Sequence, residues 1–576
     1  MTGRLSTARP RLPRARTIVL ALVLAFLAWQ VAVPIGGLLL SSLKLVRPVD
    51  PGYLTSPLTF ENFREIIASG GLFRVSFTTL VFALSASILA LTLGTYLAWV
   101  TTRTDIRLTW LISTFVLLQL AVPDFMFAIS WTFLYAPDIG YMNFLWRAGT
   151  GAGPLFDIYS LSGMIVTQAF LLMPLVYLFA VPALSALDGT LEDAGALSGA
   201  SRFRATLDIV IPLVVPALVA IWVIVMMRAW EAFDVPWVLG MRERIMTYAT
   251  RLYWDTITPP SDTGIISAYA VPMVFVAAAL VAMYQVLTRR SKRFGVVVGK
   301  PMAPRLVRPR GAVRLALSGL AILLITIGVI LPVLMILWMS LNPFYRPFTL
   351  DALWSVQLSS FERVVQAQGM LEAVMSSLVV GSATAILLIV VSVAICWTGR
   401  VRATTGGRLA TVLSFAPIAL PNVIVGLAFL WLYRGLGVPI TGTYMILILA
   451  YFTLFLAIAS RNIGARFLQV NNELFDASAL SGAGNMRTIG QIAVPMLAPA
   501  IAATSLYVVI WSFKELPAAL LLSSTGTRTV PVFMFDLSRS GSMSQVAAIA
   551  VMTILLLSVL VVLFQVIARR AGIRGF

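Results

Sequence analysis

Polar residues interrupt long apolar runs at two corresponding places in the chain. They are Asp124, Glu231 and Asp234 in the first half, and Asn422, Lys514 and Glu515 in the second. The neighbouring prolines repeat too, since Asp234-Val235-Pro236 is echoed by Glu515-Leu516-Pro517. Ionisable groups are costly to bury in lipid and mark transport paths. We therefore take the six as candidate pore or gate residues; the alternative is that they are snorkelling side chains at helix ends.

The sequence lacks the residues that a catalytic, disulfide or metal-binding site would need. There is no histidine, and the one cysteine, Cys396, lies in an apolar run. A single cysteine excludes intramolecular disulfides and cysteine clusters. No nucleophile–base set and no metal-ligand cluster is recognisable. We therefore expect neither a catalytic site, nor a cofactor, nor a dedicated metal site.

The elements that must position these residues are membrane spans. Of the 576 residues, 59% are hydrophobic and 11% are charged, against about 25% charged in soluble domains. The apolar residues form blocks of about 20, the length that a bilayer-spanning helix needs. The first six spans are predicted at 18–41, 75–100, 108–135, 161–186, 210–233 and 264–287. The second six are predicted at 314–340, 373–397, 409–433, 443–464, 492–512 and 544–567.

Basic residues predict the orientation. Nine lysines and arginines and no acidic residue lie in the segment 289–314. Basic residues are enriched in cytoplasmic loops, so this segment and both termini are expected to be cytoplasmic. The net charge of +19 is then a matter of topology and does not indicate a nucleic-acid partner. The arginine-rich start and the run 18–40 resemble a signal peptide, but the run is too long for one.

A duplicated loop relates the two halves. Residues 191–218 and 474–501 align without gaps and share 13 of 28 positions. Both copies lie between the fourth and fifth spans of their halves, on the cytoplasmic side. Two copies on one side of the membrane indicate a parallel repeat, with its axis along the membrane normal.

The loop sequence predicts a helical elbow. Thr190 and Asn472 are placed to cap its first short helix, which small residues fill. Gly199 and Gly482 can take a positive φ and end that helix. A second helical stretch leads to Pro212 and Pro495, which are expected to open the next span.

These residues match a known signature. The pattern E-A-A-x3-G-x9-I-x-L-P marks the cytoplasmic loop of permease subunits in bacterial binding-protein-dependent ABC importers. Asp193, Ala194, Gly199 and Pro212 fit it in the first copy, and Asp476, Ala477, Gly482 and Pro495 in the second. Both copies have Asp for Glu and a small residue for the second Ala. The chain resembles the fused twelve-span permeases of the ferric-iron and thiamine type.

The resemblance implies an architecture and partners. The fold class is an all-α polytopic membrane protein of two homologous six-helix halves, with the type I ABC importer permease (MetI-like) fold. The halves would be residues 1–288 and 314–576, joined by a basic cytoplasmic linker at 289–313. The implied partners are two ATPase subunits docked at the elbows, a periplasmic substrate-binding protein and the bilayer of the inner membrane. The permease itself would carry no ATPase activity.

The cargo is less well determined. Ferric iron is the leading candidate, and thiamine, 2-aminoethylphosphonate and polyamines are the alternatives, because their permeases look similar. An ion-coupled secondary transporter is the alternative of another class, since it also favours six plus six spans. The scarcity of acidic residues in the middle of the spans argues against it.

Overall fold

The computed structural model describes residues 14–186, 211–291, 306–400 and 405–570. Within these ranges the secondary structure is helical and contains no strand. The expectation of an all-α polytopic protein is confirmed. Coupling-loop residues Asp193, Ala194 and Gly199 fall outside the described residues.

The helices of the first half surround the long helix α4. They are α1 Arg14–Leu27, α2 Val33–Ser42, α3 Glu61–Ala68, α4 Gly71–Arg103, α5 Thr109–Ala121, α6 Asp124–Tyr135, α7 Tyr141–Thr150, α8 Leu161–Ser185, α11 Ile211–Trp230, α12 Tyr248–Ile257 and α13 Thr263–Ser291. Two π-helical turns also occur, η1 Ala28–Ala32 and η3 Pro236–Gly240.

The second half repeats this order. Its α-helices are α14 Gly311–Ile325, α15 Leu331–Ser340, α16 Leu350–Leu353, α17 Ser359–Gln366, α18 Met370–Arg400, α19 Thr405–Phe415, α20 Asn422–Gly435, α21 Tyr444–Phe467, α22 Asn472–Leu480, α23 Asn485–Thr488, α24 Val494–Ser512, α25 Pro517–Leu522, α26 Val530–Arg539 and α27 Met543–Arg570. Between them lie π turns η5 Thr326–Ile330 and η7 Ile489–Ala493, and 3-10 turns η6 Ala416–Ala419 and η8 Thr525–Thr527.

The spans agree with the predicted set except at two places. Among the described residues, ten helices are long and apolar enough to cross a bilayer, or up to twelve spans if each of two bent pairs counts as one. The predicted spans at 108–135 and 409–433 each consist of two helices that meet at a bend of 109°. The bends fall at Pro123 and Pro421, which have extended backbone. A proline lacks the N–H that would continue the helix, so each pair restarts at the next residue.

The first span of each half reaches across to the opposite half. Helix α2 packs against α20 as well as α13, and α15 packs against α6 as well as α27. Each of these spans contains a π turn just before a proline, Pro34 or Pro332. A π turn tolerates the missing proline N–H without breaking the span. The halves are therefore interlocked and do not simply lie side by side.

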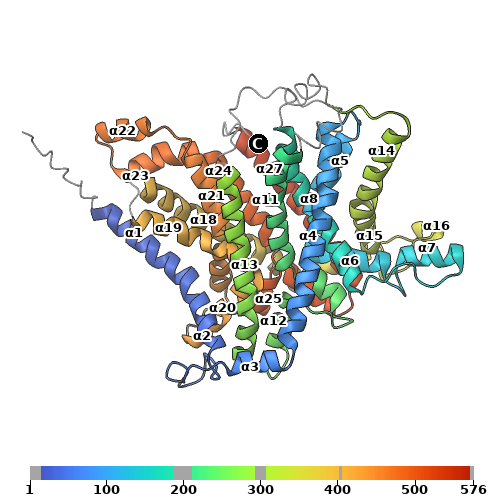
Figure 1. Ribbon diagram of the computed structural model, residues 1–576, viewed down its shortest axis with the longest axis horizontal. Coiled ribbons are helices and arrows are strands. Elements are labelled where there is room, and N and C mark those ends of the chain that lie inside the picture. The colour runs from blue at the N-terminus through green and yellow to red at the C-terminus, as the bar shows by residue number, and fades with distance from the viewer. Residues whose placement is uncertain (1–13, 187–210, 292–305, 401–404, 571–576) are drawn as a thin grey trace, which may run out of the picture.

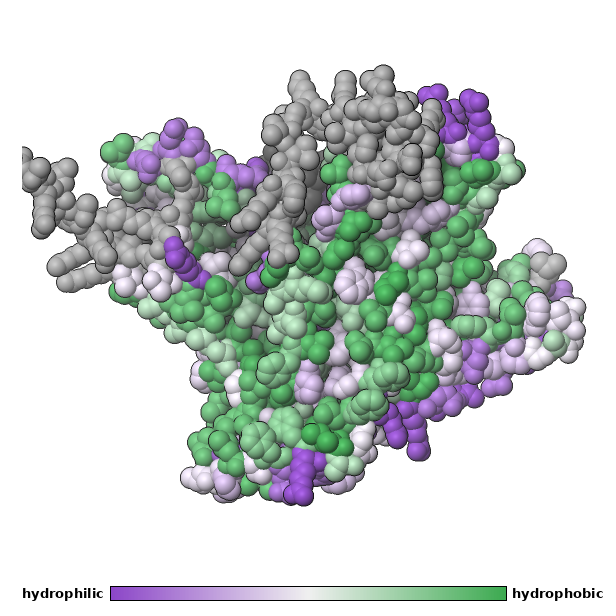
Figure 2. Space-filling view, viewed as in Figure 1, coloured by the Kyte–Doolittle hydropathy of each residue, from purple (hydrophilic) through white to green (hydrophobic). Residues whose placement is uncertain are grey.

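Different short helices lie at the two ends of the bundle. Helices α22 and α23 lie at one end, whereas α3, α12 and α25 lie towards the other (Figure 1). Apolar side chains cover the middle of the face shown in Figure 2, and polar ones gather at its ends. This pattern is that of a protein surrounded by lipid across its middle.

Close packing of α4 on α8 forms the centre of the first half, and Gly94 makes it possible. A methyl group added at Gly94 would lie 2.5 Å from Cβ of Val176 and 2.7 Å from the carbonyl oxygen of Met173. By contrast, a methyl group added at Gly319 on α14 would have no atom within 4 Å.

We therefore expect Gly94→Ala to destabilise the protein, because the two helices would have to move apart. Overpacking of this kind costs about 1–3 kcal/mol. The melting temperature of the purified protein in detergent should fall for Gly94→Ala and stay unchanged for Gly319→Ala. Equal melting temperatures for the two variants would contradict this account of the packing.

Candidate functional site

The structure brings the candidate gate residues together at the boundary between the halves. Lys514 lies just after α24, and its Nζ is 2.8 Å from Oδ1 of Asp124, the first residue of α6. Only 6% of the Lys514 side chain is exposed, against 28% for Asp124. The same ammonium group donates to the carbonyl oxygen of Leu120 at 3.1 Å. A cation of the second half is thus held by the broken span of the first.

In the second half, the other broken span holds a carboxylate. Asn422 opens α20, and its Nδ2 donates to Oε2 of Glu515 at 2.6 Å. The other carboxylate oxygen accepts from the backbone N–H of Ala518 at 3.2 Å. Glu515 is 2% exposed. Both of its oxygens therefore have partners within its own half, as a buried carboxylate requires.

Asp234 occupies the matching place in the first half but lacks such partners. Its Oδ1 is buried and has no hydrogen-bond partner. Asp124, Glu515 and Lys514 all lie within electrostatic range of it. The first half thus places two acidic residues where the second half has an amide and an acid.

A second cation borders the same cluster from the first half. Arg228, near the end of α11, forms an ion pair of 2.7 Å with Glu231. Its guanidinium carbon also lies 5.3 Å from the ring centroid of Trp511 on α24, and Lys514 Nζ lies 5.3 Å from the same ring. Cations are attracted to the face of a tryptophan ring. Trp511 therefore joins Arg228 to Lys514 across the boundary.

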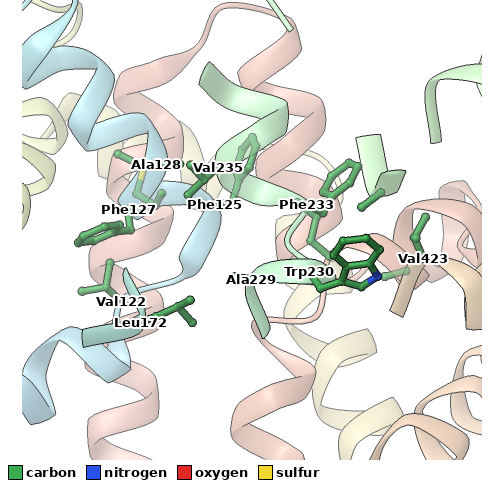
Figure 3. Close-up of a cluster of buried hydrophobic side chains, with 14 of the residues drawn as sticks. Val122, Phe125, Phe127, Ala128, Leu172, Ala229, Trp230, Phe233, Val235 and Val423 are labelled. Carbon is green, nitrogen blue, oxygen red and sulfur yellow. The ribbon is translucent and has the colours of Figure 1, made fainter. Parts of the chain in front are cut away.

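Aromatic side chains pack across the same boundary. Phe535 of α26 lies 5.6 Å from Phe125 and 5.5 Å from Trp237, measured between ring centroids. Phe125 and Val235 lie side by side where α6 meets the segment after α11 (Figure 3). The sequence does not reveal this cluster, because an aromatic residue in an apolar run has the same hydropathy whether it faces lipid or another helix.

The second copy of the cytoplasmic loop folds as an elbow. Helix α22 holds Asp476 and Ala477, and Gly482 follows it with φ +76°. The Ser478 and Thr488 hydroxyl groups, 2.8 Å apart, join the two arms of the elbow. The capping residue is Asn471, which accepts from the N–H of Glu473 at 3.1 Å; the expected cap, Asn472, is the first residue of the helix.

Pro495 is the second residue of α24, but the helix that precedes it continues into α24. The helix runs from Asn485 to Ser512, and the π turn η7 just before Pro495 accommodates the proline. In the first copy, Pro212 is the second residue of α11 as described. Elbow and span therefore form one continuous body in the second half.

An aromatic side chain fixes the elbow to the bundle. The ring of Phe475 on α22 lies 5.6 Å from that of Trp397 on α18 and 6.0 Å from that of Phe467 on α21. These residues border a separate small apolar core that includes Ala493 and Leu497. The elbow therefore packs against three spans, α18, α21 and α24.

We expect Phe475→Ala to loosen the elbow without unfolding the bundle. The loss of the ring contacts should cost on the order of 2 kcal/mol of local stability, less than the roughly 3–5 kcal/mol for a fully buried phenylalanine. Amide hydrogen exchange over residues 472–488 should become faster. Leu474→Ala, at a neighbouring position that is 42% exposed, is the control and should leave the exchange unchanged. Unchanged exchange in Phe475→Ala would rule out this anchor.

In the part of the chain that the structure describes, no group of three or more His, Cys, Asp or Glu side chains is arranged to hold a metal ion. The six candidate gate residues (Asp124, Glu231, Asp234, Asn422, Lys514 and Glu515) form what we call the boundary cluster. Three of its acidic residues, Asp124, Glu231 and Glu515, are engaged by Lys514, Arg228 and Asn422 respectively.

Comparison with known proteins places the chain in a family. The sequence profile of the "binding-protein-dependent transport system inner membrane component" matches residues 90–293 and again residues 391–573. The chain belongs to this family. It is a fused permease of the ABC importer class, with one copy of the family domain in each half, as the sequence predicted.

Individual relatives differ in length and cargo. The ferric transport system permease protein FbpB of Actinobacillus pleuropneumoniae is 21% identical over 88% of this chain and 72% of its own. A putative 2-aminoethylphosphonate permease, PhnV of Salmonella typhimurium, is 22% identical over 35% of this chain and 76% of its own. The putrescine permease PotI of Escherichia coli is 28% identical over 38% of this chain and 79% of its own.

Family membership has direct consequences. The permease is a multi-pass protein of the inner membrane, and its relatives are transport components, not enzymes. A binding-protein-dependent system implies a substrate-binding protein and an ATPase as partners.

Proposed function

We propose that this permease forms the passage for ferric iron through the inner membrane. The observation that carries the proposal is coverage: the ferric transport relative aligns with 88% of the chain, through both halves. The phosphonate and putrescine relatives align with 35% and 38%. Acidic residues at the boundary cluster suit a cation as cargo. Thiamine, 2-aminoethylphosphonate and polyamines are the alternatives.

We propose the passage itself at the boundary cluster. Asp124, Glu231, Asp234, Asn422, Lys514 and Glu515 are its gate residues. This proposal is supported by the charged side chains of both halves that meet where two spans are broken. Irregular backbone at membrane depth is tolerated where it is enclosed by protein or lines a cavity.

The ATPase contacts are proposed at the elbows. Each half would receive one ATPase subunit, in the first half at Asp193, Ala194, Gly199 and Pro212, and in the second at Asp476, Ala477, Gly482 and Pro495. In the second elbow, Leu480 is 90% and Met486 80% exposed. Apolar side chains exposed beside a carboxylate are suited to docking in a protein groove.

The elbows also fix the proposed orientation. With the ATPases in the cytoplasm, both termini lie on the cytoplasmic side. The proposed halves are residues 1–288 and 314–576, joined by the basic cytoplasmic linker 289–313. The flanking helices support this division, since α13 ends at Ser291 and α14 begins at Gly311.

Uptake by the reconstituted complex tests the function. We expect proteoliposomes that contain the permease, with its genomically adjacent ATPase and binding protein, to accumulate radiolabelled Fe³⁺ only with ATP. Accumulation of thiamine, putrescine or aminoethylphosphonate in its place would overturn the assignment of iron. Transport that follows an ion gradient without the ATPase would indicate a secondary transporter instead.

Gly482 tests the role of the elbow. Because its φ is +76°, Gly482→Val should distort the turn, at a cost of about 1–3 kcal/mol. We expect ATP-driven uptake to be lost while the protein still inserts in the membrane. Gly490→Val, a control where an added Cβ also has no neighbour within 4 Å and φ is not positive, should retain uptake. Normal uptake in Gly482→Val would remove the elbow from the coupling mechanism.

A further inference from the structure

The contacts across the boundary cluster are unequal in the two halves. Lys514 of the second half binds Asp124 and the carbonyl oxygen of Leu120 in the first half. Arg228 of the first half lies on Trp511 of the second. The segment 511–514 therefore supplies one partner of each of these contacts.

The two halves differ in charge at positions that the internal repeat aligns, and Lys514 compensates for the difference. Asn422 in the second half corresponds to Asp124 in the first, and Glu515 corresponds to Asp234. In the second half the amide donates to the carboxylate. In the first half the same two positions hold two carboxylates, which repel one another unless a cation lies close to them. Lys514 is the cation that the opposite half provides.

This cation has no counterpart in the repeat. Aligning Asp234-Val235-Pro236 with Glu515-Leu516-Pro517 places Phe233 opposite Lys514. Phe233 is 2% exposed and its ring stacks 5.5 Å from that of Trp237 within the first half. In this alignment, the cation that pairs with Asp124 is supplied by the second half alone.

We propose that Lys514 is an electrostatic latch that holds the passage closed, and that its separation from Asp124 is a required step of opening. This inference rests on the proposed passage at the boundary cluster. The ammonium group and the carboxylate come from different halves, so the halves cannot part there while the pair is intact. Lys514 is buried, and a buried charge that loses its partner is strongly destabilised. Opening must therefore separate the pair and also admit water or cargo to solvate both charges.

Variants that remove either charge of the Lys514–Asp124 pair test the latch, and the rate of ATP hydrolysis is the quantity measured. We expect Lys514→Met and Asp124→Asn each to raise ATP hydrolysis in the absence of binding protein about fivefold or more, the lower end of coupling between sites. The exchanged pair, Asp124→Lys with Lys514→Glu, should restore the low rate. Arg242→Met is the matched control, since it breaks an exposed 3.3 Å pair with Asp138 inside the first half. A side chain that merely stabilises the fold would not be rescued by the exchange.

Cross-linking tests the same step when single variants prove unstable. Cys396 is the only cysteine, so Cys396→Ser provides a background free of thiols. In it, Asp124→Cys and Lys514→Cys would be joined by a short bis-methanethiosulfonate reagent that dithiothreitol removes. Uptake should stop on joining and return on reduction, whereas the control pair Asp138→Cys and Arg242→Cys should keep uptake throughout.

The outcomes separate the latch from the function on which it rests. Uptake that continues after Asp124→Cys and Lys514→Cys are joined overturns the latch. A basal ATPase rate in Lys514→Met equal to that of the unaltered complex also overturns it. Absence of ATP-driven uptake by the unaltered complex overturns the proposed function instead, before any variant is compared.

Discussion

A polar group at membrane depth has to find its partner inside the protein, because lipid offers none. This constraint explains where the unusual features of the permease lie. Two spans break at Pro123 and Pro421, and each break is enclosed between the halves. The ion pair of buried Lys514 with Asp124 lies at the first break, and the buried carboxylate of Glu515 lies at the second. Broken backbone and charge thus occur together, where protein surrounds both.

The internal repeat sets the architecture but not the electrostatics. Both halves place a broken span and an acid–x–proline segment at the boundary. One substitution within the repeat, Asp124 against Asn422, changes the balance of charge, and Lys514 restores it from the other half. A chain that holds both halves can keep such a one-sided device, since each half always meets the same partner. An identical pair of subunits would place the lysine on both sides.

The elbow connects this boundary to the cytoplasmic end of the bundle. Phe475 fixes α22 to α18 and α21, and the continuous helix Asn485–Ser512 ends three residues before Glu515. One continuous helix therefore connects the elbow to Trp511, and Lys514 follows directly after its end. Helices α2 and α15 each pack against the opposite half, so the first spans also hold the two halves together.

The sequence alone determined the class, the spans, the repeat and the elbow, since these depend on hydropathy, length and local backbone preference. It also identified Asp124, Lys514, Glu515 and Asn422 as exceptions in apolar surroundings. It did not reveal which of them pair, because pairing depends on a bend of 109° that brings the start of α6 to the end of α24. Nor did it identify Phe475 or Phe535, because a ring that anchors and a ring that faces lipid have the same hydropathy. Only the tertiary structure decided those contacts, through the way in which one half packs on the other.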